Sequence, residues 1–432
     1  MSSFSTIPSR RGSILQRMLR GRVLQRLTGL QHGALCIRDG HSEITVGNAD
    51  GPFGTLQLQV RNWQFFVALS LRGALGAGES FVAGHWGCAE PAQIVRLLLR
   101  DRSVLQGVDR GISRWCKPLL QLGHALRRNT RTGSRKNIAA HYDLGDDFFA
   151  LFLDDSMTYS SAVFPHRDAS MAEGQQHKLR RLCQKLALSP RDHLLEIGSG
   201  WGSMAVTAGR DFGARVTTTT ISARQLRAVR ERVLAAGLAG RVEALGSDYR
   251  DLQGQYDKIV SVEMIEAVGH HYLPTFFRRC SELLRPGGVV AMQAITIADQ
   301  HYEQALRRVD FIKRYVFPGS FIPSVTALVD AATLASDLRL CHLEDFGQHY
   351  AETLRRWRLQ LQKNTDAILQ AGYPESLVRT WEWYLAYCEG GFAEGYLGVA
   401  QLLFARPGIT LSVPAALPQV AADPYGPAAR PA

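Results

Sequence analysis

Segments typical of β-strands alternate with segments typical of helices after residue 193, and this alternation restricts the fold more than any other feature. The strand candidates are short and mostly apolar, and they read HLLEIG, ARVTTTT, RVEAL, YDKIVSV and GVVAMQAI. The helix candidates between them read WGSMAVTAGRDFG, SARQLRAVRERVLAAG and LPTFFRRCSELLRPGG. This order is typical of a parallel, doubly wound sheet covered by helices. We therefore predict an α/β fold for this part of the chain.

A glycine-rich turn follows the first of these strands in LLEIGSGWGSMAV, residues 194–206. Gly198, Gly200 and Gly202 alternate, whereas a dinucleotide-binding turn places its third glycine later and needs an acidic residue about 20 positions further on. Here that distance reaches VTTTTIS, which offers hydroxyls and no carboxylate. A turn without a phosphate cradle suits S-adenosylmethionine, whose amino-acid part needs a close backbone approach. A purely structural turn in another α/β protein is the alternative.

Two acidic residues strengthen the first interpretation. Glu196 lies just before the turn, and Asp248 in GSDYRDL follows the third strand candidate. Ligands of doubly wound sheets bind outside the carboxyl ends of the strands. Asp248 is therefore placed to accept a hydrogen bond from an adenine amino group, and the sequence predicts a site for S-adenosylmethionine.

The net charge of +11 is concentrated near the N-terminus. Residues 1–140 contain 20 Lys and Arg against 7 Asp and Glu, whereas the remainder contains 30 against 32. A basic block of this size favours a polyanionic partner, either nucleic acid or an anionic membrane surface. The basic run at 127–136 lacks the interleaved aromatic side chains of a single-strand nucleic-acid groove. We therefore favour the membrane surface and expect no nucleic-acid partner.

The segment SRRGSILQRMLRGRVLQRLTGL, residues 9–30, spaces its apolar residues near the helical period and places arginines mostly between them. A basic amphipathic helix of this kind can lie in a lipid interface. It can equally pack on its own domain and expose a solvated basic face. The sequence leaves both interpretations open.

Changes in composition divide the chain. We expect a basic, lipid-associated α+β domain over residues 1–125, a basic linker over 126–140, the doubly wound domain over 141–408 and a disordered, Pro- and Ala-rich tail over 409–432. No apolar run reaches the roughly 18–20 residues that a membrane-spanning helix needs. Seven scattered cysteines without a CxxC pair indicate reduced thiols, a cytosolic setting and no metal site.

From about residue 135 to residue 408 the sequence resembles the cyclopropane-fatty-acyl-phospholipid synthases and the related mycolic-acid cyclopropane synthases. The resemblance rests on HYDLGDDFFALFLDDSMTYSSAVF, LLEIGSGWG, TISARQL, VEMIEAVGHHYLPTFF, FIKRYVFPGSFIPS, HYAETLRRW and YCEGGF. It implies a Rossmann-like class I methyltransferase domain with a seven-stranded mixed sheet and a helical insertion over an acyl pocket. It also implies methyl transfer from S-adenosylmethionine to a cis double bond of an unsaturated phospholipid acyl chain, which then closes to a cyclopropane ring.

The resemblance further implies a bound bicarbonate, the base that takes a proton from the carbocation so that the ring closes. The positions that would hold this anion are Ser161, Glu266, Gln293, Ile295 and Tyr350. Ser161 stands where the family has a cysteine and keeps a hydroxyl donor, and Gln293 stands where the family has a histidine. Gln293 can hydrogen-bond an anion, but it cannot carry a proton as histidine does.

The cofactor positions of the family match this chain well. They are Tyr159 and Ser160 before the anion site, Gly198, Gly200 and Gly202 in the turn, Thr220 and Gln225 at the ribose, and Asp248 near the adenine. Cys388 in YCEGGF matches a cysteine long proposed as catalytic in the family. Because the chemistry needs no thiol nucleophile, a packed cysteine near the acyl channel is the alternative.

Two of the five anion positions depart from the family pattern, so ring closure is not the only outcome to consider. Without a base at the new methyl group, a hydride shift and loss of another proton would give a methyl- or methylene-branched chain. A catalytically inactive lipid-binding relative is a candidate of a different class. A small-molecule or RNA methyltransferase would explain the glycine turn but not the later motifs. We expect a peripheral enzyme on the inner, cytoplasmic face of a membrane, with a homodimer left open.

Overall fold

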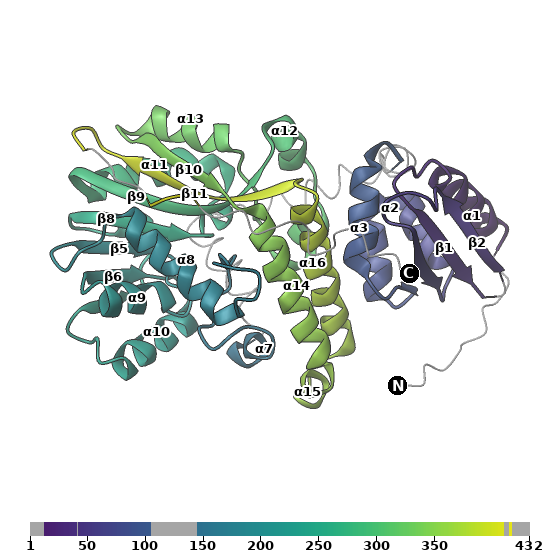
Figure 1. Cartoon of the computed structure of the whole chain (residues 1–432), viewed down its shortest axis with the longest axis horizontal. Helices are drawn as coiled ribbons and strands as arrows, with labels where there is room; N and C mark the ends of the chain where they lie inside the picture. The colour runs from purple at the N-terminus through teal and green to yellow at the C-terminus, as the bar shows by residue number, and fades with distance from the viewer. Residues whose placement is uncertain (1–12, 41, 105–144, 410–413, 417–432) are drawn as a thin grey trace.

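The computed structural model describes residues 13–40, 42–104, 145–409 and 414–416. A large domain built on a seven-stranded sheet and a small N-terminal domain lie on opposite sides of α14 (Gly347–Lys363) and α16 (Glu375–Ala393), as Figure 1 shows. The predicted linker and nearly all of the predicted tail lie outside the described residues.

The large sheet has the strand order β10-β11-β9-β8-β5-β6-β7. Its five mutually parallel strands are β5 (His193–Ile197), β6 (Arg215–Thr219), β7 (Val242–Leu245), β8 (Tyr256–Val262) and β9 (Leu284–Ile297). β11 (Leu397–Ala405) runs antiparallel to both β9 and β10 (Arg339–Asp345). The predicted seven-stranded mixed sheet is confirmed. β10 was not among the predicted strands, because all its residues are exposed or only partly buried and the polar and apolar residues of RLCHLED do not alternate regularly.

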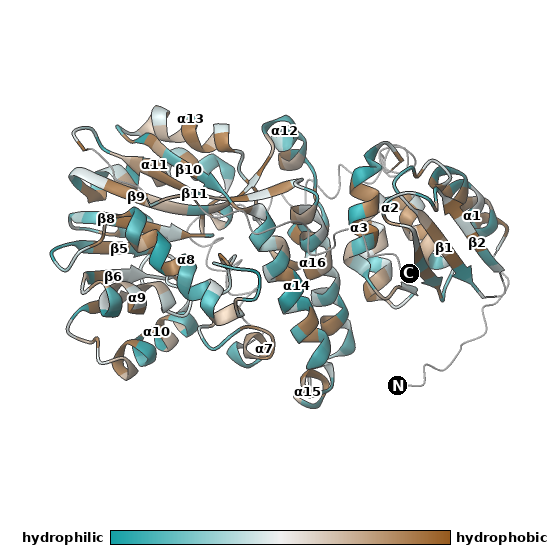
Figure 2. Cartoon of the chain, viewed as in Figure 1, coloured by the Kyte–Doolittle hydropathy of each residue, from teal (hydrophilic) through white to brown (hydrophobic). Residues whose placement is uncertain are grey.

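Helices cover both faces of this sheet, and the central strands are buried and mainly brown in Figure 2. The helices of the large domain outside the central pair are α7 (Asp146–Ala150), α8 (Met171–Lys185), α9 (Ser203–Asp211), α10 (Ala223–Ala235), α11 (Leu273–Leu283), α12 (Asp299–Arg307), α13 (Val325–Ala335) and α15 (Thr365–Gln370). The chain runs from β5 outward to β7 and then returns to β8 on the other side of β5. Ligands bind at such a reversal, outside the carboxyl ends of the strands.

The N-terminal domain has a four-stranded sheet in the order β2-β1-β3-β4. Its elements are α1 (Ile14–Leu27), β1 (Ala34–Asp39), β2 (Ser42–Gly47), β3 (Thr55–Val60), α2 (Gln64–Val82), β4 (Trp86–Gly87) and α3 (Pro91–Arg100).

Helix α1 packs on this domain through one stripe of residues at helical spacing, Leu19, Val23 and Leu27. The same helix leaves its first apolar residues outside, because Ile14, Leu15 and Met18 are 72%, 60% and 55% exposed. The packing interpretation therefore holds for one face of α1.

Helix α2 contradicts the expectation that no apolar segment is long enough to span a membrane. Its 19 residues are long and apolar enough to cross a membrane by length and composition, and 44% of that window is buried inside the protein. The helix is kinked at Gly73, where φ is 56°, and it contains an ion pair between Arg72 and Glu79. It packs against α1 and α16. These contacts are those of a core helix in a folded domain, which the sequence analysis did not identify.

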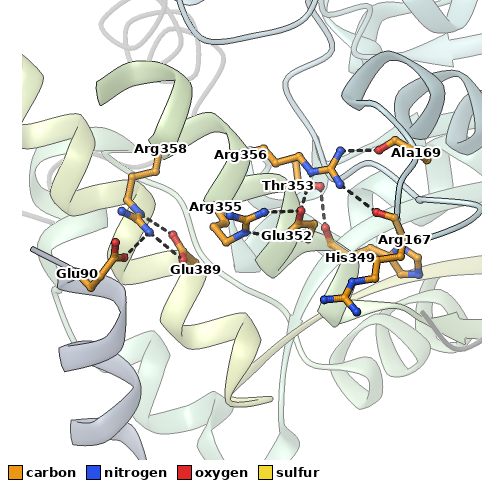
Figure 3. A network of polar contacts seen from close by, with 10 residues as sticks. All are labelled: Glu90, Arg167, Ala169, His349, Glu352, Thr353, Arg355, Arg356, Arg358 and Glu389. Carbon is orange, nitrogen blue, oxygen red and sulfur yellow. Dashed lines mark hydrogen bonds and ion pairs between the residues drawn. The ribbon is translucent and has the colours of Figure 1, made fainter. Parts of the chain in front are cut away.

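Ion pairs join the two domains around α14 and α16. Arg358 of α14 donates to Glu389 of α16 at 2.7 Å and to Glu90 at the start of α3 at 3.1 Å, as Figure 3 shows. Arg358 and Glu389 are 1% and 0% exposed. Glu394, just after α16, pairs with Arg96 and Arg100 of α3. The N-terminal domain is thereby held against the helices that line the site described next.

Candidate active site

A cavity of about 510 Å³ lies at the carboxyl ends of the parallel strands. This volume is within the usual range for small-molecule sites, roughly 300–1,000 Å³. Its walls come from the turns after β5, β6 and β8, from α16, and from α2 and α3 of the N-terminal domain. The predicted site residues in its lining are Tyr159, Ser160, Glu196, Gly198, Gly200, Thr220, Gln225, Asp248, Glu266, Ile295, Tyr350 and Cys388.

The glycine turn shapes one part of the cavity, which we call the cofactor end. Gly198, Gly200 and Gly202 have φ values of 95°, 49° and 91°, a region that favours glycine. A Cβ atom on Gly200 would meet nothing within 4 Å, so the backbone there faces open space. The N–H groups of Gly198 and Ser199 both donate to the carbonyl of Thr219 at 3.0 Å. Gly202 ends the turn as the N-cap of α9 and is not in the cavity lining.

Polar side chains follow the next two strands at the same end. Thr220, directly after β6, donates its hydroxyl to the side-chain oxygen of Gln225 at 2.9 Å. Asp248, after β7, accepts from Arg250 through both carboxylate oxygens, at 2.8 and 2.7 Å. The predicted adenine position therefore holds an ion pair and not a lone carboxylate.

A buried acid and a buried base lie beside the turn. Thr218 donates to Glu196 at 2.6 Å, and burial raises the pKa of Glu196 to about 8. Lys178 of α8 donates to the Ser160 hydroxyl at 2.6 Å, and burial lowers its pKa to about 8. Lys178 was not among the predicted site residues, because a lysine in a polar helix normally indicates a solvated face.

The other part of the cavity, the carboxylate end, contains two partly buried glutamates. Glu266 accepts from the backbone N–H of Ile295 at 2.6 Å through Oε1. Its Oε2 is buried and has no hydrogen-bond partner among the described residues. Burial first, and the neighbouring Glu263 second, raise the pKa of Glu266 to about 8.

Glu263, which the sequence analysis did not single out, is the second of these glutamates. Its Oε1 accepts from the backbone N–H of Ser161 at 2.9 Å and from the amide of Gln293 at 2.8 Å. Its Oε2 accepts from the Tyr350 hydroxyl at 2.7 Å. Three of the five positions predicted to hold bicarbonate thus donate to Glu263, and a fourth, Ile295, donates to Glu266. The only signal in the sequence was the pair of glutamates in VEMIE.

These contacts do not fit a bound bicarbonate. The donors that such an anion would need already serve the carboxyl groups of the chain, and a further anion beside the ionised carboxylate of Glu263 would be repelled. The expected hydroxyl donor of Ser161 is also corrected. That hydroxyl donates to the carbonyl of Ala162 at 2.9 Å, and the backbone N–H of Ser161 faces Glu263 instead.

Aromatic side chains and Cys388 complete the walls. Tyr159 donates its hydroxyl to Tyr384 at 2.9 Å and stacks on Phe317 with ring centroids 6.5 Å apart. Aromatic faces of this kind can stabilise a cation. Burial raises the pKa of the Cys388 thiol, and Asp310 adds to the effect, so this cysteine remains a neutral thiol.

The chain matches the family model described as mycolic acid cyclopropane synthetase over residues 129–402. It is 40% identical to tuberculostearic acid methyltransferase UfaA1 of Mycobacterium tuberculosis, over 78% of this chain and 80% of that protein. It is 36% identical to a probable fatty acid methyltransferase of Pseudomonas putida, over 65% of this chain and 72% of that protein. It is 32% identical to the cyclopropane-fatty-acyl-phospholipid synthase of Escherichia coli K12, over 81% and 87%.

Solved structures agree with these relatives. The cyclopropane synthase MmaA2 of Mycobacterium tuberculosis is 30% identical, with a TM-score of 0.59 over 63% of this chain and 98% of that one. Mycolic acid cyclopropane synthase CmaA1, solved with SAH and CTAB, is 31% identical, with a TM-score of 0.59 over the same shares of the two chains. The predicted class I methyltransferase fold and the use of S-adenosylmethionine are thereby confirmed. The chain belongs to the mycolic acid cyclopropane synthetase family, whose members use S-adenosylmethionine to methylate or cyclopropanate lipid acyl chains.

Proposed function

We propose that this enzyme transfers a methyl group to a cis double bond of an unsaturated phospholipid acyl chain and releases a methyl- or methylene-branched chain. The supporting observation is that one cavity joins the glycine turn to apolar and aromatic walls and to two partly buried glutamates. An isolated alkene is a weak nucleophile, so it must be aligned with the methyl donor in a site that excludes water. Residues of α2 and α3 extend the apolar wall, and an acyl chain would lie along them.

S-adenosylmethionine supplies the electrophilic methyl group when it is bound. The turn from Gly198 to Gly202 would hold its amino-acid part, Thr220 and Gln225 its ribose, and the region of Asp248 its adenine. The rings of Tyr159 and Phe317 would stabilise the positive charge that methyl transfer leaves on the acyl chain.

Two observations favour a branched product over a ring. The donors that would hold bicarbonate serve Glu263, which disfavours the anion implied by the ring-forming members. The two relatives with 40% and 36% identity are named as methyltransferases, whereas the cyclopropane synthase has 32%. A cyclopropane remains the second candidate, because that relative is matched over most of its length.

Lipid products made with a trideuteromethyl donor test this proposal. Purified enzyme would be given vesicles of unsaturated phospholipid, and the fatty acids would be analysed by mass spectrometry before and after ozonolysis. A methyl-branched alkene keeps all three deuterons and is cleaved, whereas a methylene branch keeps two and is cleaved. A ring keeps two deuterons and resists cleavage, which would establish the second candidate. No deuterium in any lipid would contradict both.

We also propose that the enzyme docks on the inner face of a membrane through the start of α1. Ile14, Leu15 and Met18 are exposed there, beside the exposed Arg17 and Arg22. Attraction to anionic lipid is worth about 1 kcal/mol for each well-placed basic residue. The three apolar side chains would enter the acyl boundary.

Vesicle sedimentation tests this docking. Replacing Ile14, Leu15 and Met18 by serine should weaken binding to equal mixtures of phosphatidylglycerol and phosphatidylcholine by about tenfold or more, with the unfolding temperature unchanged. Leu334→Ser is a matched control, because Leu334 is 82% exposed on α13. Equal binding by the triple variant and the wild type would contradict the proposal.

A further inference from the structure

Glu263 has a backbone conformation that is unfavourable for a residue with a side chain. Glu263 follows β8 directly and has φ of 46°, in the left-handed region where glycine is favoured. Its backbone N–H donates to the carbonyl of Gln293 at 2.8 Å, which fixes the turn. A residue with a Cβ atom is strained in this region, because the Cβ lies too close to the following carbonyl oxygen. Such strain occurs at functional sites, where the side chain has a role that glycine could not fill.

The hydrogen bonds of Glu263 orient its carboxylate without saturating it. Three donors, from Ser161, Gln293 and Tyr350, reach it at 2.7–2.9 Å. An ionised carboxylate offers about four acceptor positions, so one position remains. Glu263 also lines the cavity, together with Glu266, Ile295 and Tyr350. The remaining position is therefore available to a group inside the cavity.

The two glutamates have different environments. Three donors and the buried Lys178 favour the ionised form of Glu263, although burial raises its pKa above the ordinary value. Glu266 has one backbone donor, and its pKa is raised by burial and by the charge of Glu263. Paired carboxyl groups in unequal environments divide into one that holds a proton and one that can accept it. Glu263 is the member that can accept.

We infer that the carboxylate of Glu263 is the proton acceptor of the reaction and takes the place of a diffusible bicarbonate. This inference rests on the proposed function. After methyl transfer the acyl chain is a carbocation with the new methyl group on the neighbouring carbon. For a branched product, a C–H bond on a carbon next to the cationic carbon breaks, after a 1,2-hydride shift where that carbon is the new methyl group, and its electron pair becomes the new C=C bond. For a ring, a C–H bond of the new methyl group breaks without that shift, and its electron pair becomes the closing C–C bond. In each case the proton goes to Glu263. No oxidant or reductant is needed.

Two substitutions distinguish the chemical role of the Glu263 carboxylate from the effect of its side-chain volume. Glu263→Gln keeps the shape but cannot accept the proton, so its rate should fall about 100-fold or more. Glu263→Gly removes the carboxylate and suits the left-handed backbone, so it should fold normally and lose a similar factor. Formate or bicarbonate should restore the glycine variant by about tenfold or more but should leave the glutamine variant unchanged. The exposed Glu243→Gln on β7 is the control.

The assay is methyl transfer to vesicles of unsaturated phospholipid in buffer freed of carbon dioxide, with S-adenosylmethionine affinity measured for each variant by calorimetry. The wild type should work at full rate without bicarbonate, and the variants should bind the donor as the wild type does. The inference is overturned if the wild type requires bicarbonate, if Glu263→Gln keeps more than about a tenth of the rate, or if neither anion restores Glu263→Gly. If the wild type methylates no lipid under any condition, the proposed function itself fails.

Discussion

The two ends of the cavity are built in different ways. At the cofactor end, the important residues lie in or directly after consecutive strands, and short local spacings hold them: the glycines of one turn, Thr220 with Gln225, and Asp248 with Arg250. At the carboxylate end, the contacts join residues far apart in the chain. Ser161, Glu263, Gln293 and Tyr350 come from a loop, a strand end, a strand and a helix.

This difference separates what is common to the family from what distinguishes this chain. The cofactor end fits S-adenosylmethionine, which all ring-forming and methylating relatives would share. The carboxylate end departs from the family pattern at Ser161 and Gln293, and both departures contact Glu263. A change in chemistry can therefore arise at one end of the cavity while the other end stays the same.

The largest effect is expected at the cofactor end, from Gly198→Val. A side chain there would be strained at φ of 95° and would approach Met264 within about 3.0 Å. We expect S-adenosylmethionine affinity, measured by calorimetry, to fall about 100-fold. Gly240→Ala is the control, because a Cβ at that position meets nothing within 4 Å. Unchanged affinity would mean that the turn does not hold the donor.

A smaller effect, on the pH dependence of stability, is expected at the carboxylate end from Glu266→Gln. The pKa of Glu266 is about 8 when folded, against about 4.3 when unfolded. Between these values the folded protein holds a proton that the unfolded chain has released, so this contribution to stability falls as the pH rises and is lost above pH 8. Between pH 5 and pH 8, the free energy of unfolding measured in urea should therefore fall by on the order of 2 kcal/mol more in the wild type than in the variant.

Parallel curves for the wild type and Glu266→Gln would contradict the assignment of the proton to Glu266. Donor affinity should not change in this variant, because its substitution lies at the other end of the cavity. A loss of affinity would show that the two ends of the cavity are coupled.

The smallest effect is expected from Gln401→Leu on β11. Gln401 is buried and donates to the side-chain oxygen of Gln293 at 3.0 Å, so it positions the amide that contacts Glu263. We expect the turnover rate to fall by roughly three- to tenfold, with a shifted pH profile and unchanged donor affinity. An unchanged profile would mean that Gln293 is positioned without this contact.

Much of the fold was predictable, because strands buried on both faces are almost continuously apolar and the helices between them follow the 3.6-residue period. The edge strand β10 and the apolar helix α2 were missed. β10 is half exposed, and α2 contains charged residues and a glycine kink that interrupt its pattern. Lys178 and Glu263 were missed because a buried charge and a left-handed backbone have no signal in a single sequence.

The sequence alone determined the α/β class, the glycine turn and the family, because each depends on residues a few positions apart and on backbone preferences that act locally. Only the tertiary structure decided what fills the predicted anion site. The loop at Ser161, the end of β8, the strand β9 and the helix α14 meet only when the sheet and its covering helices pack. Burial at that meeting point then sets the proton affinities of Glu263 and Glu266, and no spacing along the chain records that burial.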